Sequence, residues 1–296
     1  MRHFSIGLVT FLLLLTACNS STEQNGKKII SVSIIPQKYF VEMIAGDEFE
    51  INVLIPPGSS PASYDLSPKQ LKDLNKSKVY LKVGHLGFEK AWMTSIKKNH
   101  EDLKIADLSA GCDLVQGVET EEEHAAHGHD HSHAGIDPHI WMSPKSALIM
   151  AENTAKAIIR YDPACQDLIR ENLEVFKSRI KDLDSAFQVL ADGLVNKKFI
   201  IFHPALTYLA RDYGLEQIPI EFEGKEPSAA YLKKLIDRAK SENISTVFIQ
   251  KEFDQDNARQ ISKDLDAKLI QIDPLEEDWE KQMRELLEAF RVTNDK

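Results

Sequence analysis

The sequence has no excess of positive charge. Its 36 lysine and arginine residues are outnumbered by 46 aspartate and glutamate residues, which gives a formal net charge of −10. Nucleic-acid binding needs a basic face, so this composition argues against a nucleic-acid partner. The two signs are mixed along most of the chain, as on an ordinary solvated surface. A chain of 296 residues can bury a real core, either as two modest domains or as one large one.

The sequence also has no apolar run of transmembrane length. The apolar run from Phe4 to Leu15 follows a short basic start and is too short to cross a bilayer of about 30 Å as a helix. We therefore expect residues 1–17 to be a signal peptide. Leu15-Thr16-Ala17-Cys18 resembles a bacterial lipobox, which predicts that Cys18 carries lipid and that 18–28 is a polar tether. An ordinary signal cleaved at small residues is the alternative. On the lipobox interpretation, the protein is exported and anchored at the outer side of the cytoplasmic membrane or in the periplasm.

Cysteine is scarce, with three residues in the chain. If Cys18 carries lipid, Cys112 and Cys165 remain. In an oxidising compartment such a pair can form a disulfide, and we expect one here. Two separate buried thiols are the alternative, because nothing in the sequence fixes their distance.

Short apolar strands alternate with helices in both halves of the chain. The predicted strands are 28–35, 49–55, 78–83 and 104–108 in the first half, and 198–202, 217–222, 246–250 and 268–272 in the second. Predicted helices lie between them, including 204–213, 229–241, 256–265 and 277–290. Such alternation is typical of parallel βαβ units. We therefore predict an α/β fold with two βα lobes, 29–143 and 195–296, each built on a parallel sheet of four strands.

The segment 144–194 between the lobes is predicted to be helical. Pro144 starts a helix to about Tyr161, and Asp162-Pro163 restarts it. Apolar residues then recur at alternating steps of four and three: Ile169, Leu173, Phe176, Ile180, Leu183, Phe187, Leu190 and Leu194. They form one stripe on a helix of about 30 residues, or about 45 Å. A coiled-coil dimer is the competing interpretation. We expect a rigid helix joining both lobes of a monomer, because strands and helices resume directly after it.

A histidine-rich segment at 121–134 contains almost no large apolar residue. Its histidines are His124, His127, His129, His131 and His133. Such a composition cannot bury a core, so we expect a solvated loop. Neutral imidazole is a good zinc ligand, so the loop should collect zinc weakly. A polar loop that binds metal incidentally is the alternative.

Four further candidate ligands lie at or near strand ends. His203 and Asp273 directly follow predicted strands, His85 follows another, and His139 lies just before the inter-lobe helices. Ligands of open parallel sheets bind beyond the carboxyl ends of the strands, so these side chains should meet in the cleft between the lobes. Three imidazoles and one carboxylate suit a tetrahedral divalent ion, with zinc favoured over manganese. For any single histidine, a hydrogen-bonded structural role is the alternative.

The sequence resembles the metal-binding subunits of bacterial zinc and manganese ABC importers over nearly all of its mature length. The motifs that carry the resemblance are Ile34-Ile35-Pro36, Ile44-Ala45-Gly46-Asp47, Val53 to Pro68, Leu86-Gly87-Phe88-Glu89 with Trp92, Asp137-Pro138-His139-Ile140-Trp141 through Pro144, His203-Pro204-Ala205 with Tyr208, Asp212-Tyr213-Gly214-Leu215, Glu226-Pro227-Ser228 and Asp273-Pro274-Leu275. The resemblance implies two βα lobes, a rigid connecting helix and a metal ion between the lobes. His139, His203 and Asp273 match the family's ligand positions, and a histidine-rich loop is typical of its zinc members.

The chain departs from the family at the first ligand position. The family has a histidine after the proline of a G-x-x-P-H-x-Y-E pattern, but here Ala62 follows Pro61 and cannot coordinate an ion. Either the site has lost a ligand or another residue supplies it. We expect His85 to do so, since the loops after the second and third strands should open on the same cleft edge. An exposed histidine on a cleft-side turn, with water or Asp65 completing the shell, is the alternative. Gln250 also stands where the family often has glutamate.

The resemblance implies a lipoprotein that captures zinc outside the cytoplasm and delivers it to an ABC-type membrane permease. A zinc-dependent hydrolase is one alternative, but the sequence has no H-E-x-x-H motif. A metal-binding surface adhesin is the other. We therefore expect a binding protein and not an enzyme.

Deleting residues 121–133 should remove weak zinc binding and leave one tight site, because the loop's composition cannot preorganise a coordination geometry. Calorimetric titration of the full-length and loop-deleted chains measures both classes of site. Loss of the tight site together with the loop would contradict the division into a collecting loop and a fixed site.

Overall fold

The structure is a computed structural model that describes residues 27–117, 135–221, 227–251 and 256–294. Cys18 and the histidines of the 121–134 loop lie outside these ranges, so the predictions made for them stay predictions.

The first lobe is built on a parallel four-stranded sheet of order β2-β1-β3-β4. Its elements are β1 (Lys28–Val32), α1 (Ile35–Ala45), β2 (Phe49–Val53), α2 (Pro68–Leu74), β3 (Val79–Lys82), α3 (Gly87–Asn99) and β4 (Lys104–Asp107). Ser67 caps α2 by accepting from the Gln70 backbone N–H at 3.3 Å, as its position before Pro68 predicts. Gly46 ends α1 at a φ of 58°, a left-handed value that favours glycine.

The second lobe repeats this topology with the order β6-β5-β7-β8, also parallel. Its elements are β5 (Lys198–Ile201), α7 (Thr207–Tyr213), β6 (Glu216–Pro219), α8 (Ala229–Ser241), β7 (Thr246–Gln250), α9 (Asp256–Asp264), β8 (Lys268–Ile272) and α10 (Trp279–Asn294). The helix expected from Pro204 begins three residues later, at Thr207, because the Ala205 N–H closes a tight turn onto the His203 carbonyl at 2.7 Å. The two-lobed α/β fold is confirmed.

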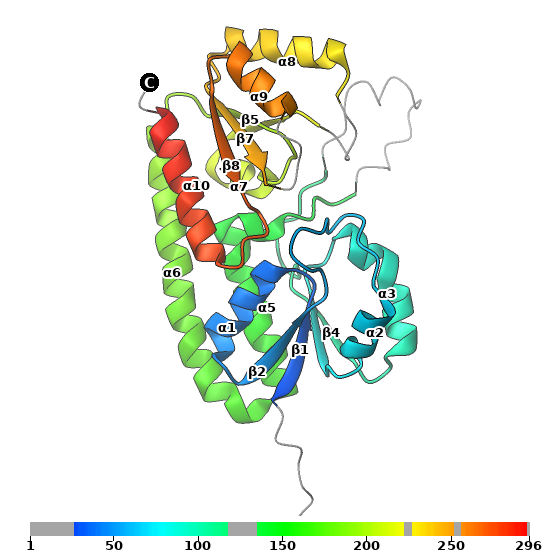
Figure 1. The fold of residues 1–296 in the computed structure, drawn as a ribbon. Coiled ribbons are helices and arrows are strands. Elements are labelled where there is room, and N and C mark those ends of the chain that lie inside the picture. Colours follow the sequence, from blue (N-terminus) through cyan, green and yellow to red (C-terminus); the bar gives the residue numbers. More distant parts are fainter. Residues whose placement is uncertain (1–26, 118–134, 222–226, 252–255, 295–296) are drawn as a thin grey trace, which may run out of the picture.

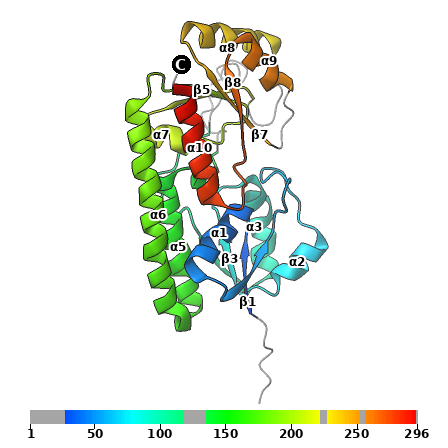
Figure 2. The ribbon, with the colours of Figure 1, turned by 60° about the vertical axis from the view of Figure 1, so that its left-hand side comes forward.

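Helices join the two lobes, as the apolar stripe predicts. The elements are η1 (Ile140–Met142), α5 (Pro144–Tyr161), η2 (Pro163–Cys165) and α6 (Gln166–Gly193), a single helix of 28 residues. Figures 1 and 2 show α6 running along both lobes, with α10 beside its upper part. The stripe residues Ile169, Phe176, Ile180, Leu183 and Phe187 are buried within the chain itself. The inter-lobe packing expected of this helix is confirmed.

One apolar core extends through both lobes. It combines side chains of the first sheet, α1, α5 and α6 with side chains of β5, β7 and α10, and a smaller core lies elsewhere in the second lobe. Phe40 on α1 is central to the junction, because its ring lies 5.2 Å from Phe176 of α6 and 5.3 Å from Trp279 of α10. Edge-to-face aromatic contacts at such distances are favourable. The lobes are therefore held together by apolar packing and not by a linker alone.

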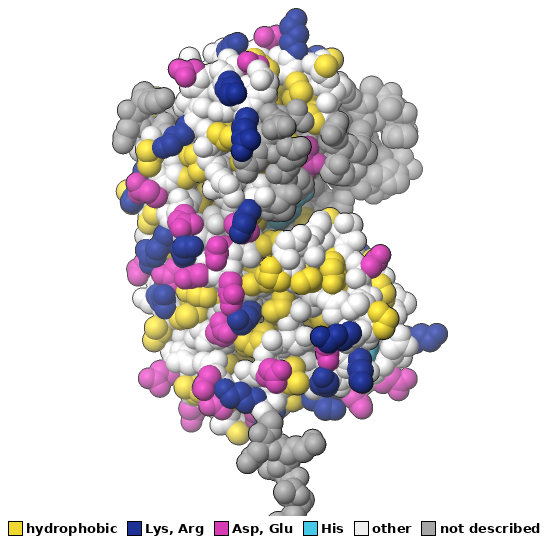
Figure 3. Space-filling model, viewed as in Figure 1, with side chains coloured by type: hydrophobic (Ala, Val, Ile, Leu, Met, Phe, Trp, Pro, Cys, Tyr) yellow, Lys and Arg dark blue, Asp and Glu magenta, His cyan; other side chains and the backbone are white. Residues whose placement is uncertain are grey.

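The outer surface carries both signs of charge. Figure 3 shows lysine or arginine intermingled with aspartate or glutamate along the side of the molecule on which α6 lies. Within the described ranges, no helix has the length and apolar character needed to cross a membrane.

The expected disulfide between Cys112 and Cys165 is wrong, because neither thiol is bonded. The Cys112 Sγ lies 3.9 Å from the Ser146 carbonyl near the start of α5, whereas the Cys165 Sγ lies 3.0 Å from the Asp162 carbonyl just beyond its end. The intervening helix separates these two points by about 24 Å, and a disulfide requires Cα atoms within about 7 Å. Burial raises the pKa of the Cys112 thiol to about 11, which makes it a poor nucleophile.

His100 makes the first lobe sensitive to acid. Its side chain is 9% exposed, and neither ring nitrogen has a hydrogen-bond partner among the described residues. Burial lowers the pKa of His100 below its ordinary value, because the folded protein favours the neutral ring. The folded protein is therefore most stable above the ordinary pKa, and it loses stability as pH falls towards the lowered pKa.

The His100→Phe variant should therefore be more stable than the parent by about 1 kcal/mol near pH 6, because it removes an unsatisfied buried polar ring. Urea unfolding between pH 5 and pH 8 tests this, and the gain should grow as pH falls. A variant that is destabilised at every pH would show that the ring is satisfied in solution.

Candidate metal centre

The four predicted ligands lie at the carboxyl ends of strands or in the segment between the lobes. His85 follows β3, His203 follows β5, Asp273 follows β8 and His139 precedes η1. Figure 1 shows the carboxyl ends of both sheets directed towards the junction of the two lobes. In the second sheet, β5 lies between β6 and β7. The chain after β5 therefore crosses to one side of the sheet, to β6, and the chain after β7 crosses to the other side, to β8. His203 therefore lies at the switch point where open α/β sheets bind ligands.

Asp137 orients His139. Its Oδ1 accepts a hydrogen bond from the His139 backbone N–H at 2.8 Å and lies 2.9 Å from the ring Nδ1. The carboxyl group is 5% exposed. Burial raises the pKa of Asp137, but its interactions with His139 and the hydrogen bond from the Thr207 hydroxyl outweigh burial and hold that pKa below its ordinary value. An ionised Asp137 accepts a hydrogen bond from the Nδ1–H of His139, which leaves Nε2 unprotonated and able to bind a metal.

His203 is held through both its ring and its backbone. The ring Nδ1 is hydrogen-bonded to the carboxyl group of Glu221, which is buried. The side-chain amide of Gln250, at the end of β7, donates to the His203 carbonyl at 2.6 Å and accepts from its backbone N–H at 3.2 Å. Gln250 is fully buried, so its amide fixes the direction in which the chain leaves β5. As with His139, a metal ion would bind to Nε2 of this ring.

The structure brings these two histidines together. Their ring centroids are 5.1 Å apart and the rings are nearly perpendicular, at 72°. Each ring is backed by a carboxyl group on its Nδ1 side, an arrangement that fixes the tautomer and raises the basicity of a metal-binding imidazole. Imidazole nitrogen is a common zinc ligand, so this pair is the strongest candidate for metal binding among the described residues.

The segment that carries Asp273 is hydrogen-bonded to the segment that carries His139, through the backbone carbonyl of Pro274. The indole N–H of Trp141, two residues after His139, donates to the Pro274 carbonyl at 2.8 Å. The Trp279 indole donates in turn to the Trp141 carbonyl at 2.7 Å. The carboxylate of Asp273 lies 3.8 Å from the ammonium group of Lys251. The positive charge next to the Asp273 carboxylate is thus the Lys251 side chain.

His85 lies on a loop that Glu89 fixes. The buried Glu89 carboxyl accepts from the backbone N–H groups of Val83 and Gly84, both at 2.7 Å. The Phe88 N–H donates to the Pro61 carbonyl at 3.0 Å, so the loop that carries Ala62 and the loop that carries His85 are neighbours, as expected. Burial lowers the pKa of His85, and the charged groups that act on it are Asp107, Lys82 and Lys90.

Across the described ranges, no three His, Cys, Asp or Glu side chains lie together in a way that could hold a metal ion. Of the four predicted ligands, the contacts of the structure join His139 to His203 and connect Asp273 through Trp141. They do not bring His85 to the pair.

Several residues that position the candidate ligands are not predicted from the sequence. They are Glu221, Thr207, Trp141 and Gln250. Glu221 follows β6 by two residues, so its strand-end position was a usable signal. The roles of Thr207 and Trp141 depend on contacts between residues about 70 and 130 positions apart, which leave no local pattern.

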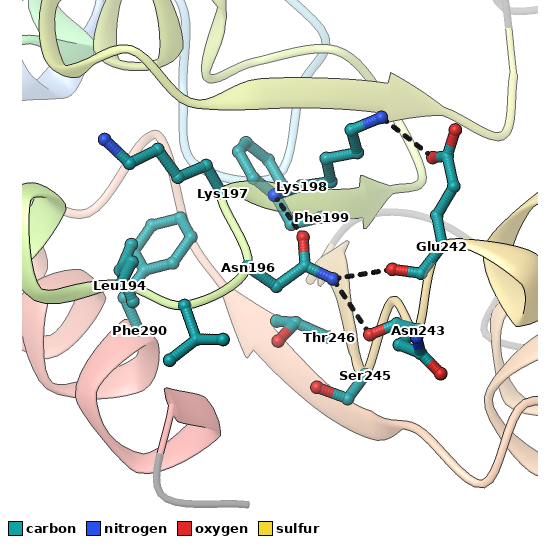
Figure 4. A pocket seen from close by; sticks show the side chains of 11 residues that line it. Leu194, Asn196, Lys197, Lys198, Phe199, Glu242, Asn243, Ser245, Thr246 and Phe290 are labelled. Carbon is teal, nitrogen blue, oxygen red and sulfur yellow. Dashed lines mark hydrogen bonds and ion pairs between the residues drawn. The ribbon is translucent and has the colours of Figure 1, made fainter.

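A separate cavity of about 380 Å³ lies at the other end of the second sheet. Its walls include the starts of β5 and β7, as Figure 4 shows. The Asn196 amide donates to the Glu242 and Asn243 carbonyls, both at 2.9 Å, and Lys198 pairs with Glu242 at 3.1 Å. The cavity is therefore at the amino ends of the strands and shares no residue with the candidate metal centre, and its Asn196 and Lys198 side chains make structural contacts.

Two parallel βα lobes on a rigid helix, with carboxylate-backed histidines where their sheets face each other, define a metal-binding member of the two-lobed solute-binding proteins. Comparison with known families is more specific. Residues 30–292 match the family described as ZnuA, zinc-uptake complex component A, periplasmic, and the chain belongs to this family. The resemblance noted from the motifs is confirmed. The family consists of transport proteins, so the expectation that the chain is not an enzyme is also confirmed.

Relatives and solved structures agree with this assignment. The high-affinity zinc uptake system protein ZnuA of Bacillus subtilis (strain 168) is 30% identical over 275 residues, which cover 90% of this chain and 86% of that protein. The zinc-binding lipoprotein AdcA of Streptococcus pneumoniae (strain ATCC BAA-255 / R6) is 27% identical, with 100% of this chain matched to 62% of the longer relative. A crystal structure of ZnuA is 35% identical and superposes with a TM-score of 0.79 over 90% of this chain and 98% of that one.

Replacing Gln250 with Leu should lower the free energy of unfolding by about 2 kcal/mol, because it removes the buried amide that bonds to both backbone groups of His203. The Gln188→Leu variant, on the surface of α6, should change it by less than about 0.5 kcal/mol. Denaturant unfolding measures both. Equal effects of the two substitutions would mean that the amide does not hold the His203 turn.

Proposed function

We propose that this chain captures zinc outside the cytoplasm and delivers it to an ABC-type membrane importer. The observation that carries the proposal is the pairing of His139 and His203, whose rings lie 5.1 Å apart between the two lobes. Membership of the ZnuA family and the zinc uptake and zinc-binding functions named for its relatives support the same cargo.

The proposed ligand set is His139, His203, Asp273 and His85. The two paired imidazoles would bind the ion through their Nε2 atoms, and Asp273 would add a negative charge. The Lys251 ammonium group, 3.8 Å from Asp273, would leave that carboxylate as the ion binds. His85 would complete the shell in place of the histidine absent at Ala62, by reorienting its side chain towards the pair while Glu89 holds the loop backbone. This set of three nitrogens and one oxygen favours zinc over manganese, which prefers oxygen.

The remaining parts of the chain fit the same role. A lipid on Cys18 would keep the protein beside the membrane that holds the importer, and the histidine-rich loop would raise the local zinc supply. No step in this scheme makes or breaks a covalent bond, so the chain needs no catalytic base. We propose that it acts as a monomer, because the stripe on α6 that could have formed a coiled coil is buried inside its own chain.

The His139→Ala and His203→Ala variants should each weaken zinc binding at least about 100-fold, because each removes a ligand whose geometry the protein fixes in advance. His85→Ala should have a comparable effect. Competition with a chromophoric chelator, on the chain lacking 121–133, measures the tight site without the loop. The His100→Phe variant is the matched control, since its imidazole lies away from the lobe junction and its loss should leave zinc affinity unchanged.

Calorimetry with manganese on the same proteins tests the choice of metal, and tighter binding of manganese than of zinc would overturn the proposed cargo. Unchanged affinity in His85→Ala, with binding abolished in His203→Ala, would show that the site uses fewer protein ligands than proposed.

A further inference from the structure

The ring of His139 depends on a carboxyl group that is itself held from the other lobe. Asp137 uses Oδ1 for the His139 backbone and ring. Its second oxygen, Oδ2, accepts a hydrogen bond from the Thr207 hydroxyl at 2.7 Å. Thr207 is the first residue of α7 and comes four residues after His203. The turn that carries one candidate ligand therefore leads directly into the residue that restrains the other.

The hydroxyl of Thr207 has a defined direction. It accepts a hydrogen bond from the Gln217 side-chain amide at 2.9 Å, and the carbonyl oxygen of that amide accepts from the Leu206 N–H at 2.8 Å. A hydroxyl has one proton to donate, and the Asp137 carboxylate at 2.7 Å is a stronger acceptor than the Pro204 carbonyl at 3.3 Å. Gln217 thus donates to Thr207 and Thr207 donates to Asp137, whose other carboxylate oxygen accepts from His139.

We propose that Thr207 is a positioning residue for zinc, which fixes the orientation and tautomer of His139 from the opposite lobe and so couples the two histidine ligands. This inference rests on the proposed function, because it gives Thr207 a role in the same site. With the hydroxyl removed, the Asp137 carboxylate can rotate, and the His139 ring loses the fixed acceptor that keeps its Nε2 available. Residues that orient metal-binding histidines in this way typically change metal affinity by about 10- to 100-fold.

The backbone around Asp137 has a second support, which separates positioning from folding. The Tyr208 hydroxyl donates to the Asp137 carbonyl at 2.8 Å and accepts from the Val115 N–H at 3.3 Å. Replacing Thr207 with Val keeps the side chain's shape and leaves these bonds in place. It therefore removes the restraint on the carboxylate while the segment stays attached to α7.

The test compares Thr207→Val, Thr207→Ser and Thr154→Val in the full chain, with zinc affinity of the tight site measured by chelator competition. Thr154 is a matched control, because its hydroxyl is fully buried and bonds within α5 to the Met150 carbonyl at 2.8 Å. Thr207→Val should weaken zinc binding about tenfold, Thr207→Ser should restore affinity to within about threefold of the parent, and Thr154→Val should leave it unchanged.

Long-range ¹⁵N–¹H spectra of the imidazole rings, recorded without zinc, report the tautomer of His139. If Thr207 only stabilised the fold, its replacement would leave this tautomer unchanged. The parent and Thr207→Ser should show His139 protonated at Nδ1 alone, and Thr207→Val should show a mixture of the two tautomers. Parent-like affinity and a single His139 tautomer in Thr207→Val would overturn the proposal.

Failure of the proposed function has a different signature. In that case His139→Ala and His203→Ala would themselves retain zinc affinity. If Thr207→Val proves too unstable to titrate, the tautomer of Thr207→Ala decides the question, because that variant also lacks the hydroxyl and adds no bulk.

Discussion

The apolar core that crosses from one lobe to the other is the constraint on which the rest of the structure depends. Phe40, Phe176 and Trp279 pack together from α1, α6 and α10, three helices that begin far apart in the chain. Because protein cores are close-packed, such a junction fixes the relative position of the two sheets. The carboxyl ends of the strands are therefore held facing each other, and small polar contacts between them become possible.

Polar contacts across this junction are made largely by buried groups. Trp279 in the core donates to the Trp141 carbonyl, and Trp141 donates to the Pro274 carbonyl, so the apolar junction is directly connected to the segments that carry His139 and Asp273. Buried polar groups of this kind lose free energy if a partner is removed, which makes the arrangement specific as well as stable. The lobe junction and the candidate metal centre thus share one set of contacts.

The two halves of the candidate site are held by different means. His139 and His203 each have a carboxyl partner on the ring, and both of these carboxyl groups are buried. The His85 loop is fixed through its backbone by Glu89, and its ring has charged neighbours within its own lobe. A protein that must both bind and release its cargo needs some ligands that are fixed in advance and others that can arrive and leave. In the proposed site, the paired histidines would be the ligands held in advance, and His85 would be the ligand whose side chain moves to the ion.

The helices and strands and their order can be predicted from the sequence alone. The limits of α8, β7 and β8 agree with the predicted 229–241, 246–250 and 268–272, because strand and helix periodicity is a local property. The sequence also places His203 and Asp273 directly after strands, since a residue that follows an apolar strand can be recognised in the chain itself. The tertiary structure alone decided that Cys112 and Cys165 lie at opposite ends of α5, that His139 meets His203, and that Thr207 restrains Asp137. Each of these is a distance between residues far apart in the chain, and such distances are set by packing, which no local pattern encodes.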